Sequence, residues 1–144
     1  CKIMLGFGCK VIAYDMYPNK QLADKGITYL SLDELFEQSD IISLHCPLTP
    51  DTQYLINQQT LDKMKKGVML INTSRGGLIN SSDAIEALKQ QQLGYLGVDV
   101  YEQEENLFYN DLSEDIIYDE LIVRLLSFPN VLITSHQGFL TKEA

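Results

Sequence analysis

Residues 68–77 read VMLINTSRGG, so that four apolar side chains in succession are followed at once by polar residues and a pair of glycines. An unbroken apolar run of this length is typical of a strand that is covered on both faces of a parallel sheet. In open α/β sheets, ligands bind outside the carboxyl ends of the strands. The run therefore predicts a buried strand, and it places Arg75 where a ligand would bind.

Similar apolar runs of strand length recur along the chain, and segments with helical spacing lie between them. The other predicted strands span residues 10–14, 27–30, 40–45, 94–100 and 131–135, and the predicted helices span residues 32–38, 58–64, 82–91 and 119–126. Each helix opens at or just after a residue that commonly caps helices. Regular alternation of strand and helix implies right-handed parallel crossovers. We therefore predict a doubly wound parallel α/β sheet of the Rossmann-like kind.

The start of the chain departs from a complete dinucleotide-binding fold. The G-x-G-x-x-G fingerprint is absent, because Gly6-Phe7-Gly8 continues differently and stands too close to Asp15. We interpret these glycines as the end of a helix over residues 2–5, the tail of a phosphate-binding helix. We therefore expect residues 1–144 to be a fragment, namely a partial nucleotide-binding domain that lacks its first strand and its glycine-rich loop.

The length and charge of the chain exclude several classes of partner. With 144 residues, of which 45% are apolar, the chain suits one domain with a buried core. Its formal net charge of −9 and its dispersed cations argue against nucleic acid, because binding to phosphates needs clustered Lys and Arg. No apolar stretch approaches the roughly 20 residues that a membrane-spanning helix needs, so we expect no membrane partner.

The cysteines and the acidic stretch lead to further expectations about metals, location and the molecular surface. Cys1, Cys9 and Cys46 lack the spacing of a zinc or redox site, and their odd number fits no closed disulfide framework. We expect no metal and a cytoplasmic location. The acidic stretch over residues 101–120 is expected to cross the edge of the sheet, and its carboxylates are expected to form solvated surface, namely Glu105, Glu114, Asp115 and Glu120.

Two strand ends in the first third of the chain carry candidate cofactor residues. Asp15 follows a strand where a dinucleotide fold hydrogen-bonds the adenosine ribose, and a carboxylate there repels the 2′-phosphate of NADP and favours NAD. The same Asp could instead cap the turn before Pro18. Residues 44–50, LHCPLTP, break the next strand abruptly. This loop could lie beneath a cofactor or be an ordinary connection, and we interpret His45 as a structural histidine.

Four charged or titratable side chains follow the later strands. The fork of Arg75 matches a carboxylate with two parallel hydrogen bonds, and the glycines after it let backbone approach a ligand, although an Arg there could instead tie down a loop. Asp99 could accept a hydrogen bond from a nicotinamide amide, and Glu104 lies in the same turn. His136 suits a general acid and base, since unperturbed histidine titrates near neutrality. A histidine bonded within the core is the alternative.

Residues 44–50, 72–77, 97–104 and 136–141 agree in order and spacing with one known family. They resemble the D-isomer-specific 2-hydroxyacid dehydrogenases, most of all the bacterial fermentative D-lactate dehydrogenases. The resemblance implies that Arg75 holds the substrate carboxylate, that His136 exchanges the proton on the C2 oxygen, and that Glu104 pairs with His136. It also implies a set of cofactor-binding residues, namely Asp15 at the adenosine ribose, Asp99 at the nicotinamide, and Cys46, Pro47, Thr73 and Ser74 along the cofactor.

The same resemblance implies an activity. The whole enzyme would use NADH to reduce a small 2-oxo acid, pyruvate, to D-lactate, as a homo-oligomer formed through this domain. The C-terminal end would run into the return toward a substrate domain. Formate dehydrogenases carry Gln where Glu104 stands, and residues 139–140 match lactate enzymes better than glyoxylate or hydroxypyruvate reductases. Another D-2-hydroxyacid dehydrogenase, or a non-catalytic NAD-sensing module, is the alternative. The fragment alone is expected to be inactive.

Overall fold

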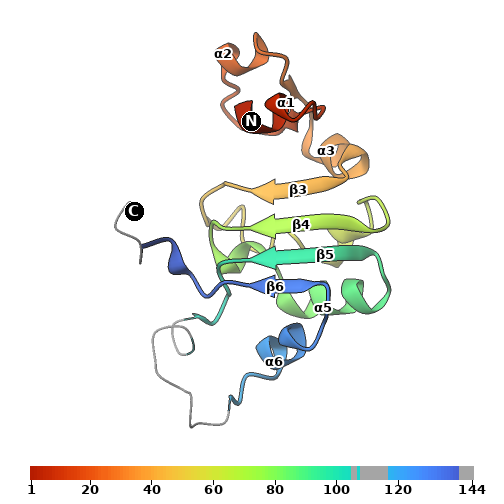
Figure 1. Ribbon diagram of the computed structural model, residues 1–144, viewed down its shortest axis with the longest axis vertical. Coiled ribbons are helices and arrows are strands. Elements are labelled where there is room, and N and C mark those ends of the chain that lie inside the picture. The colour runs from red at the N-terminus through yellow and green to blue at the C-terminus, as the bar shows by residue number, and fades with distance from the viewer. Residues whose placement is uncertain (105–106, 108–116, 140–144) are drawn as a thin grey trace.

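The computed structural model describes residues 1–104, 107 and 117–139, in which strands and helices alternate as predicted (Figure 1). The strands are β1 (Ile12–Ala13), β2 (Thr28–Tyr29), β3 (Ile41–Leu44), β4 (Val68–Asn72), β5 (Leu93–Val98) and β6 (Val131–Ile133). The helices are α1 (Lys2–Gly6), α2 (Lys20–Ala23), α3 (Leu32–Gln38), α4 (Gln58–Leu61), α5 (Ser81–Lys89) and α6 (Glu120–Leu126), with 3₁₀ turns η1 (Gly76–Leu78) and η3 (Gln137–Phe139). The six predicted strands and four predicted helices are confirmed, whereas α2 and the two 3₁₀ turns were not predicted. Most of the acidic stretch, with Glu105, Glu114 and Asp115, lies outside the described residues, as does Leu140.

All strand pairings are parallel, and they form two separate sheets. Strands β3, β4, β5 and β6 lie side by side in that order (Figure 1), while among the described strands β1 pairs only with β2. The register sets Asn72 opposite both Leu44 and Val98, and Val98 opposite Ile133, so the four strands end together. The prediction of a parallel sheet with flanking helices is confirmed. No strand of the described residues pairs with the outer edge of β3, which agrees with the expectation that the first strand of the fold is lacking.

The core lies between the four-stranded sheet and helices α4, α5 and α6, in which α5 contacts α4, α6 and β5, and α6 contacts β6. The apolar side chains buried most completely there are Phe36, Ile56, Leu61, Leu70, Leu78 and Leu93. The opposite face carries Ile41, Tyr95 and Leu132, whose exposed fractions are 52%, 56% and 65%. The apolar runs predict a sheet that is covered on both faces, whereas here one face is covered and these three side chains of the other face are exposed.

Local capping explains where the helices begin and end. Ser31 and Glu34 form a capping box at α3, and the Asp119 carboxylate accepts two backbone N–H groups at the start of α6. Helix α1 ends where Gly8, at φ +77°, donates its N–H to the Leu5 carbonyl at 2.9 Å, which belongs to a Schellman motif. The interpretation of residues 6–8 as a helix end is thus confirmed.

The structure bears on the expectations about membrane-spanning helices, cysteines and metal sites. Across the part of the chain that the structure describes, no helix is both long and apolar enough to cross a membrane. Cys1, Cys9 and Cys46 are all free thiols. Among the same described residues, no group of three or more His, Cys, Asp or Glu side chains is placed to hold a metal ion. The cytoplasmic location stays a prediction.

Candidate active site at the carboxyl edge of the sheet

The carboxyl ends of β3, β4, β5 and β6 carry loops that are joined by hydrogen bonds. The Ser74 hydroxyl donates to the Cys46 carbonyl at 2.7 Å, which ties the loop after β4 to the loop after β3. The Asp99 N–H donates to the Asn72 carbonyl at 2.9 Å, and the His136 N–H donates to the Asp99 carbonyl. Because parallel strands end at one edge, these loops bring residues that are distant in sequence to the same side of the molecule.

His136 and Glu104 are bonded to each other, with 2.8 Å between Nδ1 of the imidazole and Oε1 of the carboxylate. The second oxygen of Glu104 accepts the Tyr101 N–H at 2.8 Å, so both carboxylate oxygens have a partner. The side chains of His136 and Glu104 are 28% and 17% exposed, which shields them partly from water while leaving them accessible. A carboxylate held in this way fixes the orientation and tautomer of a histidine ring.

Asp99 holds the turn that carries His136. Its Oδ1 accepts hydrogen bonds from the Thr134 hydroxyl and from the Gln137 N–H. Ser135 and His136 have φ of 57° and 54°, a region that residues other than glycine seldom occupy. The hydrogen bonds that Asp99 accepts compensate for this backbone conformation. The contact between Asp99 and nicotinamide stays a prediction, and the structure gives this side chain a role in positioning His136.

Arg75 stands at an open hollow between the loops that follow β3 and β4, lined by His45, Pro47, Leu48, Ser74 and Arg75. The guanidinium is exposed, and its Nη1 donates to the Ser74 carbonyl at 2.6 Å. No carboxylate of the described residues forms an ion pair with it. The positive charge of Arg75 can therefore bind an anion that enters the hollow.

The paired glycines after Arg75 approach other parts of this chain. A Cβ at Gly76 would lie 2.0 Å from the carbonyl carbon of Tyr101, and a Cβ at Gly77 would lie 3.0 Å from the side chain of Leu48. Protein atoms therefore fill the space that a side chain would need at both positions, and the approach of this backbone to a ligand stays a prediction. Gly76 lets the Arg75 loop pack against the turn that carries Glu104, and Gly77 lets it pack against Leu48 in the loop after β3.

Asp15 is exposed and lies in the loop that follows β1 of the smaller sheet. Its Oδ1 accepts the Tyr17 N–H at 2.8 Å, which is the turn-capping role that we considered for it. That bond is compatible with ribose binding, because an ionised carboxylate has several acceptor sites on its two oxygens. The role of Asp15 at the ribose stays a prediction.

The other predicted cofactor residues belong to the loops around the hollow. Pro47 and Thr73 are exposed, whereas Cys46 is partly buried, and burial raises the pKa of its thiol. Nε2 of His45 is hydrogen-bonded to the Ser43 hydroxyl at 2.9 Å, which agrees with the interpretation of His45 as a structural histidine.

Three residues that organise the site were not predicted, namely Asn72, Tyr101 and Glu102. Asn72 is fully buried beneath the Arg75 turn. Burial and hydrogen bonding to Asp119 raise the pKa of Tyr101 far above its usual range. Glu102 accepts the Tyr54 hydroxyl at 2.9 Å and so joins two further loops. Of these three residues, only Asn72 could have been suspected from the sequence, because an Asn side chain often hydrogen-bonds the backbone of the turn that follows it.

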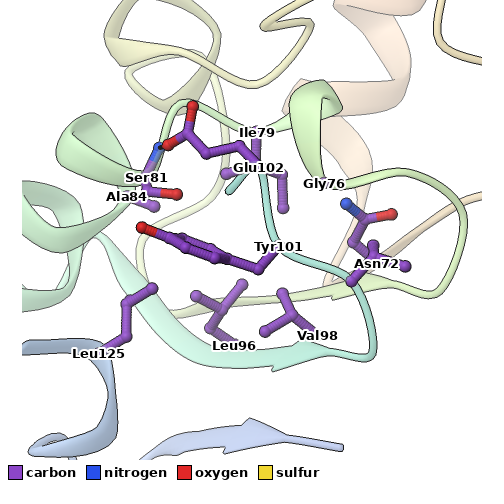
Figure 2. Close-up of a pocket in the computed structure, with 11 residues that line it drawn as sticks. Asn72, Gly76, Ile79, Ser81, Ala84, Leu96, Val98, Tyr101, Glu102 and Leu125 are labelled. Atoms are coloured by element: carbon purple, nitrogen blue, oxygen red, sulfur yellow. Dashed lines mark hydrogen bonds between the residues drawn. The ribbon is translucent and has the colours of Figure 1, made fainter. Parts of the chain in front are cut away.

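A small, partly open cavity lies next to this edge, and Figure 2 shows the Tyr101 ring among Ala84, Leu96 and Leu125 beside it. Its volume of about 20 Å³ suits roughly one water molecule. The cavity is therefore too small for a substrate, and the open hollow beside Arg75 is the candidate binding site.

Comparison with known proteins identifies the fold and the family. A sequence profile of the D-isomer specific 2-hydroxyacid dehydrogenase NAD binding domain matches residues 1–138. The chain is 52% identical to the D-lactate dehydrogenase of Escherichia coli strain K12, over 99% of this chain and 44% of that protein. The solved pyruvate reductase of Chlamydomonas reinhardtii has a TM-score of 0.94 at 52% identity, over 99% of this chain and 44% of that one. The D-lactate dehydrogenase of Aquifex aeolicus, solved with NAD and lactic acid, has a TM-score of 0.90 at 39% identity, over 99% and 43% of the two chains.

The parallel sheet with its flanking helices and these structural matches define a Rossmann-like NAD-binding domain. The chain belongs to the D-isomer specific 2-hydroxyacid dehydrogenase family, since the profile of that family covers nearly all of it. The resemblance found from the separated sequence blocks is thus confirmed. The chain spans 44% of the length of the E. coli relative, so most of that protein has no counterpart here.

Proposed function

We propose that this chain is the NAD-binding part of a longer NAD-dependent D-lactate dehydrogenase that reduces pyruvate to D-lactate. The observation that carries the proposal is the 2.8 Å hydrogen bond between His136 and Glu104, at the same sheet edge as the exposed Arg75. An imidazole held by a carboxylate suits proton exchange, and a nearby guanidinium suits a substrate that carries a carboxylate. Relatives named D-lactate dehydrogenase and pyruvate reductase support this choice of substrate.

Each of the three side chains has a distinct part in the proposed reaction. Arg75 binds the carboxylate of pyruvate through two parallel hydrogen bonds. His136 donates a proton to the C2 oxygen during reduction and takes it back during oxidation of D-lactate. Glu104 holds Nδ1 of the ring, so that Nε2 is the nitrogen that exchanges the proton, and its negative charge compensates the imidazolium. Bound NADH supplies the hydride.

The residues that are present fit NAD. The exposed carboxylate of Asp15 offers acceptor sites for ribose hydroxyls at the end of β1. The hollow at the ends of β3 and β4 is open and combines the apolar surfaces of Pro47 and Leu48 with polar groups from Ser74. Thr73 and Cys46, in the same loops, complete the proposed cofactor-binding surface.

The rest of the protein completes the proposed enzyme. The C-terminal end of the chain would lead back toward a substrate-binding domain, and the whole enzyme would be a homo-oligomer formed through the NAD-binding domain. Arg75 and His136 remain partly or fully exposed in this chain, which supports a second domain closing over them. Residues 1–144 alone would then show negligible turnover.

The test is an assay of the full-length enzyme with NADH and a panel of 2-oxo acids. We expect turnover of pyruvate with formation of the D-isomer, and negligible turnover by residues 1–144 alone. His136→Gln should lower kcat by about 10²–10⁴, the usual contribution of a positioned proton donor. Lys89→Gln, at the end of α5 and outside these loops, is the control and should leave kcat unchanged.

Other results of this assay would point to a different function or a different mechanism. Formation of L-lactate would contradict the proposal, and a preference for another 2-oxo acid would indicate a different D-2-hydroxyacid dehydrogenase. NADH binding without turnover of any 2-oxo acid would indicate a nucleotide-sensing module. Unchanged kcat in His136→Gln would remove this residue from the mechanism.

A further inference from the structure

Asn72 occupies the last position of β4, and its exposed fraction is 0%. Its Nδ2 donates to the Arg75 carbonyl at 2.9 Å, while its Oδ1 accepts the Ser74 N–H at 3.0 Å. One buried amide therefore satisfies both a donor and an acceptor of the turn that carries Arg75. A buried polar side chain with both of its functions in use holds backbone groups in one arrangement.

The Arg75 side chain depends on this turn for its place. Its guanidinium is bonded to the neighbouring Ser74 carbonyl, and no carboxylate of the described residues pairs with it. The direction in which the guanidinium leaves the backbone is thus set by the turn. The backbone carbonyl of Asn72 also accepts the Asp99 N–H at 2.9 Å, which joins this turn to the one that holds His136.

We propose that Asn72 is a positioning residue that sets the place of the Arg75 guanidinium and thereby the preference of the enzyme for substrates with a carboxylate. The inference rests on the proposed function. No other side chain of similar size can replace the amide. An aspartate would direct an oxygen instead of an N–H at the Arg75 carbonyl, and a leucine would leave the carbonyl and the Ser74 N–H without partners.

The test compares two substrates in the full-length enzyme. Pyruvate carries the carboxylate that Arg75 would bind, whereas methyl pyruvate has the same reacting carbonyl without the charge. In Asn72→Asp we expect kcat/KM for pyruvate to fall roughly 10- to 100-fold, mainly through KM, since small displacements of a binding group cost factors of this size. We expect kcat/KM for methyl pyruvate to change less than about threefold, because that substrate does not use the charge of Arg75.

Ser39→Ala is the matched control. The Ser39 side chain is also buried, and its hydroxyl donates to the Leu35 carbonyl at 2.6 Å, at the end of α3 and away from the loops that hold Arg75. Ser39→Ala therefore shows what the loss of a buried hydrogen bond does when the Arg75 turn is left intact. We expect it to leave the ratio of the two kcat/KM values unchanged.

The outcomes separate the inference from the proposed function. A folded Asn72→Asp that loses both substrates in equal proportion, or neither, overturns the role of Asn72. If Asn72→Asp does not fold by circular dichroism, Asn72→Ser replaces it, because a serine hydroxyl is too short to reach the Arg75 carbonyl and adds no charge. The ratio of the two kcat/KM values in Asn72→Ser then tests the role of Asn72 in the same way. A wild-type enzyme that reduces neither substrate contradicts the proposed function instead.

Discussion

Two carboxylates divide the task of placing His136. Asp99 holds the backbone turn, through bonds from Thr134 and Gln137, while Glu104 holds the ring itself. The backbone at His136 has a positive φ, so the turn needs such support to persist. The two neighbouring acids in the turn after β5 therefore have complementary roles.

Cys46 gives a prediction at the scale of one side chain. Burial raises the pKa of its thiol, whereas Cys1 and Cys9 are exposed. Because the thiolate is the reacting species, Cys46 should be alkylated more slowly at pH 8, and its rate should rise as the pH approaches the raised pKa. We expect Cys46 to be the slowest of the three cysteines to react at this pH. Peptide mass spectrometry after timed iodoacetamide treatment measures the three rates, and equal rates at the three cysteines would contradict this prediction.

At the scale of elements, Gly76 decides how closely η1 packs against the turn after β5. Gly76→Ala would place a Cβ 2.0 Å from the backbone of Tyr101, so the two elements would have to separate. Overpacking of this kind costs about 1–3 kcal/mol. We expect a lower Tm in thermal unfolding of the full-length enzyme, and lower activity because Tyr101 holds Glu104.

Gly6→Ala is the control for this prediction. Gly6 is the last residue of α1, and a Cβ there would meet no atom within 4 Å. Alanine also suits a helix better than glycine. The Tm of Gly6→Ala should therefore equal or exceed that of the wild type. An unchanged Tm in Gly76→Ala would show that η1 and the turn adjust without strain.

The elements that could be predicted are those whose cause is local. Ser31 and Asp119 bond backbone groups within a few residues, so the starts of α3 and α6 follow from the sequence. The apolar run of β4 likewise predicts a buried strand from neighbouring residues alone. His136 and Glu104 are 32 residues apart, and only the family resemblance suggested that they pair. The contact of Gly76 with Tyr101 and the division into two sheets depend on tertiary packing, which no local pattern reports.

At the scale of the whole molecule, the four-stranded sheet has two unlike faces. Helices α4, α5 and α6 bury one face, whereas Ile41, Tyr95 and Leu132 are exposed on the other. Doubly wound sheets carry helices on both faces. A row of exposed apolar side chains on a sheet is a surface on which other molecules associate. The 144-residue chain on its own therefore presents an apolar surface that favours association with further copies.

This surface leads to a prediction about the isolated chain. We expect residues 1–144 to self-associate as the concentration rises, as measured by sedimentation velocity. Leu132→Lys should weaken this association, because a charge then stands where apolar surfaces would meet. Leu126→Lys is the matched control, since Leu126 is 59% exposed, close to the 65% of Leu132, but belongs to α6. If both variants associate like the wild type, the unpaired edge of β3, where backbone groups can pair with another strand, is responsible instead of the apolar face.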